Sequence, residues 1–309
     1  MKQKLLFSRA AFLCALAVCA GLLAGYAAKV DSAASFDTAD TAGGQAGLSV
    51  VCTLFPVYDL VRAVGGGAVD AALLVSPGMD AHGYAPTAAD MTAAAGADLL
   101  LCVGGHADEW AAGILDNIGE VRTAALLDMV DGADALPDDH VWTSPRRCLE
   151  LLEGVRALLT ELDPDRAEAY AANAAACAAR FAALDSGFAA LAEQAGRSIV
   201  LGDKQPFGCL AADYGLAFAS AYDGCTSDTE VSAERMAALT DLMRAEGTPV
   251  VFALELSDGG LRDTLAEATG AAAGTLYSGQ AISPEDWDAG LTLADMLAFD
   301  LNAMKEALQ

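Results

Sequence analysis

Basic residues and histidines are scarce in this sequence. Its 309 residues include 17 lysines and arginines, 43 aspartates and glutamates and 3 histidines, with a formal net charge of −26 at pH 7. Such an acidic chain is a poor partner for nucleic acid or for an anionic membrane surface, because like charges repel. The same charge is compatible with a cationic ligand. A hydrophobic content of 54% argues against wholesale disorder.

Several signatures of catalysis and cofactor binding are absent from the sequence as well. It contains no G-x-S-x-G nucleophile elbow, no H-E-x-x-H pair and no glycine-rich phosphate loop ahead of a helix. Its 8 cysteines include no C-x-x-C pair, so neither a zinc ribbon nor a thioredoxin-type motif is indicated. These absences favour a binding protein over an enzyme.

The amino terminus indicates export. Three basic residues precede an uncharged run over residues 10–28, as in the basic region and apolar core of a secretory signal. That run is nearly long enough to span a membrane, so an uncleaved anchor is a second interpretation of residues 1–28. Residues 29–47 are small and polar, which predicts a flexible tether.

Lipid attachment is a further question at this end of the chain. Residues 22–25 (LLAG) resemble the start of a lipoprotein cleavage box, but Tyr26 stands where the lipidated cysteine belongs, and Cys19 follows a poorer version of the box. We therefore expect an exported protein of the cell envelope, held by an uncleaved helix or by atypical lipidation, or released. An exported location also permits disulfides, and Cys209 with Cys225 is the first pair to consider.

Short apolar runs separated by helix-like segments fill the rest of the chain. They lie at residues 50–54, 71–75, 98–103 and 122–127, and again at 198–201, 217–219, 250–254 and 275–277. Near-continuous apolarity with helical crossovers indicates strands that are buried on both faces of a parallel sheet. Two α/β lobes are therefore predicted, over residues 48–144 and 197–309.

The segment between the two lobes favours helix almost throughout. Ser144 and Asp163 each place a good N-cap residue before a proline at the first helical position, and Asp163 with Pro164 is the one break. The stretch is too long for an ordinary crossover. Residues 145–196 are therefore predicted to form a long, kinked helix that joins the lobes.

Two of the three histidines lie on loops that connect a strand to a helix. His82 belongs to residues 77–87 (PGMDAHGYAPT) and His140 to residues 138–145 (DDHVWTSP). Loops at the carboxyl ends of strands are where open α/β sheets bind ligands. A neutral imidazole is a good ligand for Zn(II) or Mn(II), so the pair predicts a transition-metal site. His106 lies on a third such loop, where we expect it to line the rim of the cleft.

The order and spacing of these motifs resemble those of the zinc and manganese solute-binding proteins that serve ABC importers. PG-x-x-x-H-x-Y-x-P-T precedes H-x-W-x-S-P, and the resemblance extends from about Leu48 to the carboxyl terminus. It implies two Rossmann-like lobes with parallel sheets, joined by a rigid spine helix, with a metal cleft between them. It further implies a monomer that captures Zn(II) or Mn(II) as transported ligand for an ABC permease, with His82 and His140 as ligands from the N-terminal lobe.

The C-terminal lobe departs from the family pattern at both of its ligand positions. Relatives carry a His or Glu three residues before the Phe of a Phe-Gly segment, where this chain has Lys204, which cannot ligate while charged. The family's acid on the last strand falls at Ser278, with Tyr277 and Gln280 as neighbours.

A carboxylate from the C-terminal lobe is nevertheless expected in the site. Two neutral imidazoles leave the charge of a dipositive ion uncompensated, and a buried cation without anionic partners is costly. Asp203, next to the family's ligand position, is the first candidate. Glu255, which follows the apolar run at 250–254, is the second.

Two other functions fit the same residues. Because Lys204 would repel a bare cation, the cleft could instead hold a metal chelate or a small organic anion. Alternatively, His82, His140 and Asp203 could form the open coordination sphere of a metal-dependent hydrolase.

Overall fold

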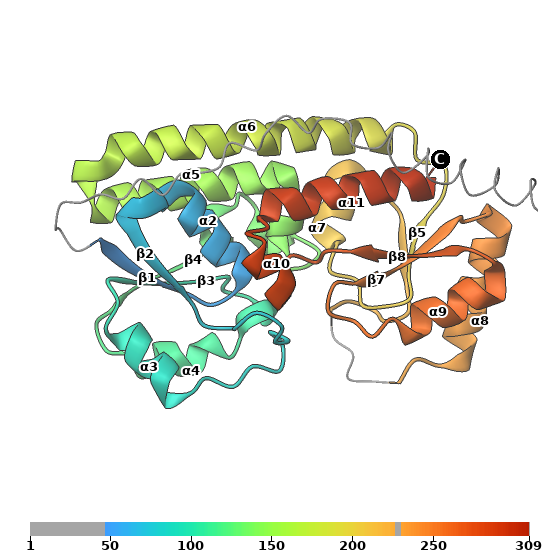
Figure 1. The fold of residues 1–309 in the computed structure, drawn as a ribbon, viewed down its shortest axis with the longest axis horizontal. Coiled ribbons are helices and arrows are strands. Elements are labelled where there is room, and N and C mark those ends of the chain that lie inside the picture. Colours follow the sequence, from blue (N-terminus) through green and yellow to red (C-terminus); the bar gives the residue numbers. More distant parts are fainter. Residues whose placement is uncertain (1–46, 226–229, 309) are drawn as a thin grey trace, which may run out of the picture. The chain divides into compact units, whose positions relative to one another are not determined.

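Two parallel four-stranded sheets form the two halves of the structure. The computed structural model describes residues 47–225 and 230–308, so the predicted signal or anchor (1–28) and almost all of the predicted tether (29–47) lie outside it (Figure 1). The strand orders are β2-β1-β3-β4 and β6-β5-β7-β8, and all of the pairs are parallel. The predicted α/β fold with two lobes is confirmed.

The strands coincide closely with the predicted apolar runs. They are β1 (Leu48–Cys52), β2 (Val69–Leu73), β3 (Leu99–Cys102), β4 (Arg122–Ala125), β5 (Ile199–Leu201), β6 (Phe218–Ser220), β7 (Val250–Leu254) and β8 (Ala272–Leu276). Every residue of β3 and β5 is buried. This follows from helices that cover both faces of each sheet, as Figure 1 shows.

The helices divide between the two halves and a connecting pair. The first half contains α2 (Phe55–Gly65), α3 (Ala88–Ala95) and α4 (Ala111–Leu115), the connection α5 (Pro145–Leu162) and α6 (Ala167–Ala192), and the second half α7 (Gly208–Tyr214), α8 (Ala233–Glu246), α9 (Gly260–Thr269), α10 (Pro284–Asp288) and α11 (Leu293–Leu308). The start of α3 shows why these segments are helical. Thr87 and Asp90 form a reciprocal capping box there.

The long helix that joins the two lobes is α6, as predicted, but residues 145–196 form a hairpin of two helices and not one kinked helix. The chain reverses at Asp163 and a 3-10 turn, Pro164–Arg166, and α6 then packs back along α5 (Figure 1). Proline lacks the N–H that would continue α5, which explains the break. The element that contacts both halves is α6, since it packs against α2 on one side and α7 and α11 on the other.

The same stretch is the one candidate membrane span within the described residues. Pro164–Ala192 is long and apolar enough to cross a membrane by length and composition. Its buried side chains, which include Tyr170, Phe181 and Phe188, pack into the main hydrophobic core. The composition is therefore that of a core helix in a fold where one long helix supports two sheets.

The two halves share one hydrophobic core. Leu60 and Trp142 of the first half and Phe207 of the second belong to the same buried cluster. Hydrogen bonds also cross between the halves, because Trp142 Nε1 donates to the carbonyl of Ser278 at 2.9 Å. The loops at the carboxyl ends of the two sheets are therefore held in fixed positions relative to each other.

Candidate metal centre

His82 lies on a loop after β2 that is fixed from both sides. Gly78 donates its N–H to the carbonyl of Ile282 at 2.7 Å and adopts φ +87°, a conformation that favours glycine. Trp110 Nε1 donates to the carbonyl of Ala81 at 3.0 Å. The first contact ties the loop to the second half of the chain and the second ties it to the first half, and the His82 side chain is only 18% exposed.

His140 is the most deeply enclosed of the three histidines. Its side chain is 2% exposed, and the ring lies 5.1 Å from that of Trp142. Within the described residues, neither ring nitrogen has a hydrogen-bond partner, although Asp139 Oδ1 lies 3.2 Å from Nδ1. A buried polar group without a hydrogen-bond partner costs free energy, so the burial of this imidazole needs an explanation.

His82 and His140 lie in two separate turns of the same kind. Asp80 Oδ1 accepts the backbone N–H of His82 at 3.0 Å, and Asp138 Oδ1 accepts that of His140 at 2.9 Å. In each case the same carboxylate oxygen lies 3.6 Å from the Nδ1 of the histidine. A carboxylate beside Nδ1 favours a proton there and leaves the other ring nitrogen free to act as a ligand.

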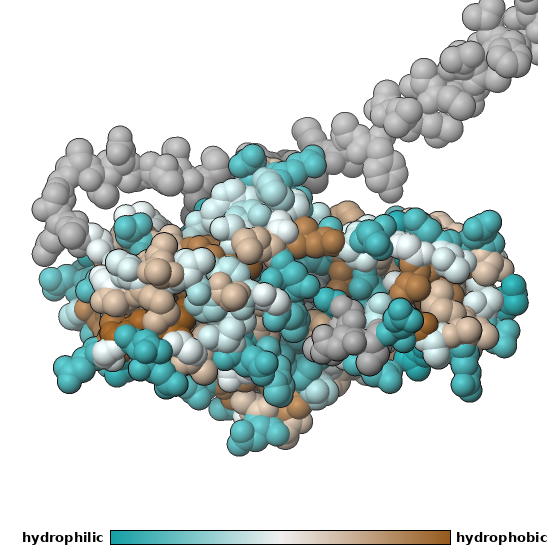
Figure 2. All heavy atoms as spheres, turned by 90° about the horizontal axis from the view of Figure 1, so that it is seen from below, coloured by the Kyte–Doolittle hydropathy of each residue, from teal (hydrophilic) through white to brown (hydrophobic). Residues whose placement is uncertain are grey.

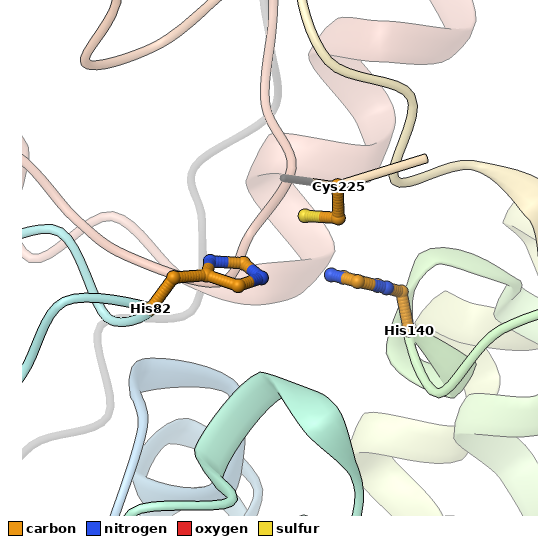
Figure 3. A group of neighbouring side chains, drawn as sticks. All are labelled: His82, His140 and Cys225. Atoms are coloured by element: carbon orange, nitrogen blue, oxygen red, sulfur yellow. The ribbon is translucent and has the colours of Figure 1, made fainter. Parts of the chain in front are cut away.

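Cys225 joins the two histidines to form one cluster. The candidate ligand atoms of His82, His140 and Cys225 all lie within 4.8 Å of one another. Figure 3 shows a ring nitrogen of each histidine pointing toward the other ring, with the sulfur of Cys225 beside the gap. Two imidazoles and a thiolate are donors that suit zinc in proteins.

Cys225 was not among the predicted ligands. It was considered only as a disulfide partner of Cys209, but all six described cysteines are free. Cys209 instead directs its sulfur to the carbonyl of Asp138 at 3.3 Å. One feature of the sequence could have pointed to Cys225 as a ligand. It lies shortly after an apolar run, the one that forms β6 and ends at Ser220.

The electrostatics of the cluster favour protons on the imidazoles. The carboxylate of Asp80, and then the thiol of Cys225, raise the pKa of His82 to about 9. Burial works against the charged form of His140, but Asp138 and Cys225 outweigh it and raise its pKa to about 10.

The thiol responds in the opposite direction. Burial by itself would raise the pKa of Cys225, but the imidazoles of His140 and His82 lower it to about 7. The thiolate is the form that binds a metal. The cluster therefore has an anionic donor of its own that does not depend on a carboxylate.

Asp203 and Glu255 are turned toward other partners. Asp203 accepts the N–H of Lys204 at 2.8 Å with one oxygen and that of Leu254 at 3.0 Å with the other. Glu255 accepts the N–H and the hydroxyl of Ser278, at 2.8 and 2.7 Å. Burial raises the pKa of Glu255. Both residues line the cavity beside the cluster, but neither belongs to the cluster itself.

The chain matches a known protein family over most of its length. The model of the family described as "Zinc-uptake complex component A periplasmic" matches residues 50–307. The chain belongs to this zinc-uptake family. The family is a class of solute-binding receptors rather than an enzyme class.

Curated relatives of this chain are named for zinc binding or zinc uptake. It is 28% identical to the zinc-binding lipoprotein AdcA of Streptococcus pneumoniae, over 84% of this chain and 55% of that protein. It is 26% identical to the high-affinity zinc uptake system protein ZnuA of Bacillus subtilis, over 88% and 90%. The chain thus spans about half the length of the AdcA relatives, and the one from Streptococcus pneumoniae is a lipoprotein by name.

Solved structures agree with the fold of the zinc-uptake family. The Zn(II)-bound ZnuA-like domain of Streptococcus pneumoniae AdcA is 28% identical and superposes with a TM-score of 0.73 over 85% of this chain and 99% of that one. The metal-dependent lipoprotein YcdH of Bacillus subtilis is 26% identical, with a TM-score of 0.75 over 85% and 100%.

Lys204 and His106, two residues that the sequence had singled out, both stand outside the cluster. Lys204 lines the cavity, where its Nζ lies 3.4 Å from Asp80 Oδ2, so its charge is partly neutralised by a carboxylate of the first half. His106 does not join the cluster. Its side chain is 95% exposed and lies beside Glu109.

A cavity opens beside the cluster. It has a volume of about 590 Å³, and its lining includes His82, Cys225, Lys204 and Gln280. His140 does not line it, so the cluster is closed on one side and open on the other. Figure 2 views one face of the molecule, on which polar residues alternate with separate apolar patches.

Proposed function

We propose that this protein is an extracytoplasmic receptor that captures Zn(II) and delivers it to an ABC permease. His82, His140 and Cys225 are its protein ligands. The observation that carries the proposal is the buried imidazole of His140, which has no hydrogen-bond partner in the described structure and faces a second imidazole and a thiol. A metal ion would satisfy all three groups at once.

The donor set favours Zn(II) over Mn(II). A thiolate is a soft ligand that zinc accepts readily, whereas manganese prefers carboxylate, carbonyl and water oxygens. The two candidate carboxylates of the second half, those of Asp203 and Glu255, already accept hydrogen bonds with both of their oxygens. The names of the zinc-binding relatives point in the same direction.

Metal content tests this proposal directly. The purified protein is expected to retain about one zinc ion per chain, as for a single site, and the double variant His82→Ala, His140→Ala to retain almost none. Equal zinc content in the two proteins would reject the site. Delivery is tested separately, by the uptake of radioactive zinc into cells that produce the wild-type chain or the double variant together with their permease.

A second candidate ligand is a metal chelate or a small organic anion. The volume of the cavity, about 590 Å³, is larger than a bare ion requires, and Lys204 supplies a cation in its wall. If a chelate is the ligand, a carboxylate chelator such as citrate will be retained together with zinc, and Lys204→Met will release the chelator. Retention of zinc alone excludes this candidate, and a test for zinc-dependent ester hydrolysis examines the hydrolase interpretation.

A further inference from the structure

Gln280 places its side-chain amide against two of the proposed zinc ligands. Its Nε2 lies 3.3 Å from His82 Nδ1, and its Oε1 lies 3.7 Å from Cys225 Sγ. The residue follows β8 in the second half of the chain, whereas His82 belongs to the first.

The position of Gln280 is well fixed. The residue is 6% exposed, and its backbone N–H donates to Ser278 Oγ at 3.2 Å. Its Nε2 also lies 3.5 Å from the carbonyl of Ala107 in the first half. The backbone contact fixes where the side chain begins, so the amide can turn about its last bond but cannot move far from the histidine and the cysteine.

When they bind a metal, His82 and Cys225 need opposite kinds of hydrogen-bonding group beside them. His82 can bind a metal through the nitrogen that faces the cluster when Nδ1 carries the proton, so Nδ1 then needs an acceptor. Cys225 binds a metal as a thiolate, which accepts hydrogen bonds and so needs a donor. Asp80 Oδ1, 3.6 Å from Nδ1, is one acceptor for His82, and Gln280 is placed to serve Nδ1 and the sulfur at the same time.

A primary amide meets both demands, and few other side chains do. It has one oxygen that accepts and an NH₂ group that donates, and a half turn about its last bond exchanges their positions. In the orientation of this structure the NH₂ faces His82 Nδ1 and the carbonyl of Ala107, and the oxygen faces the sulfur of Cys225. The half turn, which gives up the contact with Ala107, places the oxygen against Nδ1 and the NH₂ against the sulfur, as ligation by both residues requires. A carboxylate in the same place would repel the thiolate, and an apolar side chain would serve neither neighbour.

We propose that Gln280 is a positioning residue that fixes the ligating tautomer of His82 and supports the thiolate of Cys225, and so makes the site selective for thiophilic ions over Mn(II). The inference rests on the proposed zinc-receptor function. A carboxylate at this position would add an oxygen donor and disfavour the thiolate, and both changes move a site toward harder ions. Gln280 and Cys225 thus favour the same class of metal ion.

Cobalt substitution tests the proposal, because a sulfur-to-cobalt charge-transfer band reports directly on a thiolate ligand. Wild type is expected to show this band with Co(II), and Cys225→Ser to lose it. Gln280→Met removes both hydrogen-bonding ends, and should weaken zinc binding about 10- to 100-fold, the range seen when a residue supporting a ligand is lost. Gln280→Glu keeps an acceptor for His82 but removes the donor to Cys225, so it should weaken the band and shift the zinc-to-manganese affinity ratio toward manganese by about 10-fold or more.

The controls separate positioning from a structural role. Gln194 is an exposed glutamine just after α6, and its side chain bonds only to the carbonyl of Ala190 in that helix. Gln194→Met should therefore change neither the band nor the affinity ratio. If Gln280→Met lowers the melting temperature but leaves the band at saturating Co(II) and the affinity ratio unchanged, the residue is only structural and the proposal is overturned. An unchanged or tighter affinity of Gln280→Glu for zinc with an undiminished band overturns it as well.

The wild-type protein distinguishes this inference from the function on which it rests. If wild type binds no zinc, the proposed function fails and the inference fails with it. If wild type binds zinc through the two histidines while the Gln280 variants retain the sulfur band and the metal preference, only the inference fails.

Discussion

Cys225 and His140 bring a thiol sulfur and an imidazole nitrogen within 4.8 Å of each other, although they follow strands of different sheets. The buried imidazole has no hydrogen-bond partner in the described structure, and the imidazoles beside the thiol outweigh burial and lower its pKa to about 7. Each feature would be costly or without purpose in an inert core. Both features are expected of the proposed metal centre, whose ligands would be two histidines of the first half and one cysteine of the second.

His140→Ala is expected to weaken zinc binding by at least about 100-fold, more than the loss of a supporting residue, because it removes a ligand and not only its support. His106→Ala is the matched control, since that histidine is exposed and stands outside the cluster. Competition with a chromophoric zinc chelator measures both affinities. Equal affinities for the two variants would remove His140 from the ligand set.

Asp203→Asn and Glu255→Gln are expected to change zinc affinity by less than about 10-fold, below the range typical of lost ligands or their supports. The reason is that the carboxylate oxygens of both residues already accept hydrogen bonds within the second half. The two variants serve as controls for each other in the same titration. A loss beyond 10-fold in one of them would identify that acid as a ligand, as the sequence had led us to expect.

Zinc affinity should fall steadily as the pH is lowered from 9 to 6. The pKa of His82 is raised to about 9 and that of His140 to about 10, so zinc must displace a proton from each ring over this range. Below about pH 7 a further proton competes at Cys225. Calorimetry in buffers of different ionisation enthalpy would count the released protons. Proton release near zero at pH 7.5 would contradict histidine ligation.

Zinc is expected to raise the melting temperature of the protein. A free zinc concentration 100-fold above the dissociation constant adds about 2.7 kcal/mol to the free energy of unfolding, which corresponds to roughly 5 to 10 °C for a domain of this size. Differential scanning calorimetry with and without zinc measures the shift. His140→Ala should show almost none, and an equal shift in this variant would indicate binding elsewhere on the chain.

Trp142→Phe should destabilise the protein by about 1 to 3 kcal/mol, because the buried carbonyl of Ser278 loses its donor. The indole joins the first half to the loop after β8, so the variant tests whether the halves unfold together. Urea denaturation followed by circular dichroism gives the free energy. A change below 0.5 kcal/mol would show that this hydrogen bond contributes little to the contact between the halves.

Much of the fold could be read from local patterns. Apolar runs of strand length, proline after an N-cap and glycine at turns act over a few residues, so the strands and both histidine loops were predicted correctly in position. The reversal at Asp163 and Pro164 was recognised only as a kink. A proline break marks where a helix ends, but the direction that the chain then takes depends on what the next helix packs against.

The sequence by itself determined the α/β class, the loops that carry His82 and His140, and the departure from the family pattern at Lys204. Only the tertiary structure brought Cys225 and Gln280 to these histidines and turned the oxygens of Asp203 and Glu255 onto neighbouring groups. The physical reason is distance along the chain. A ligand set assembled across two sheets is decided by how their edges pack, and no local pattern of residues records that packing.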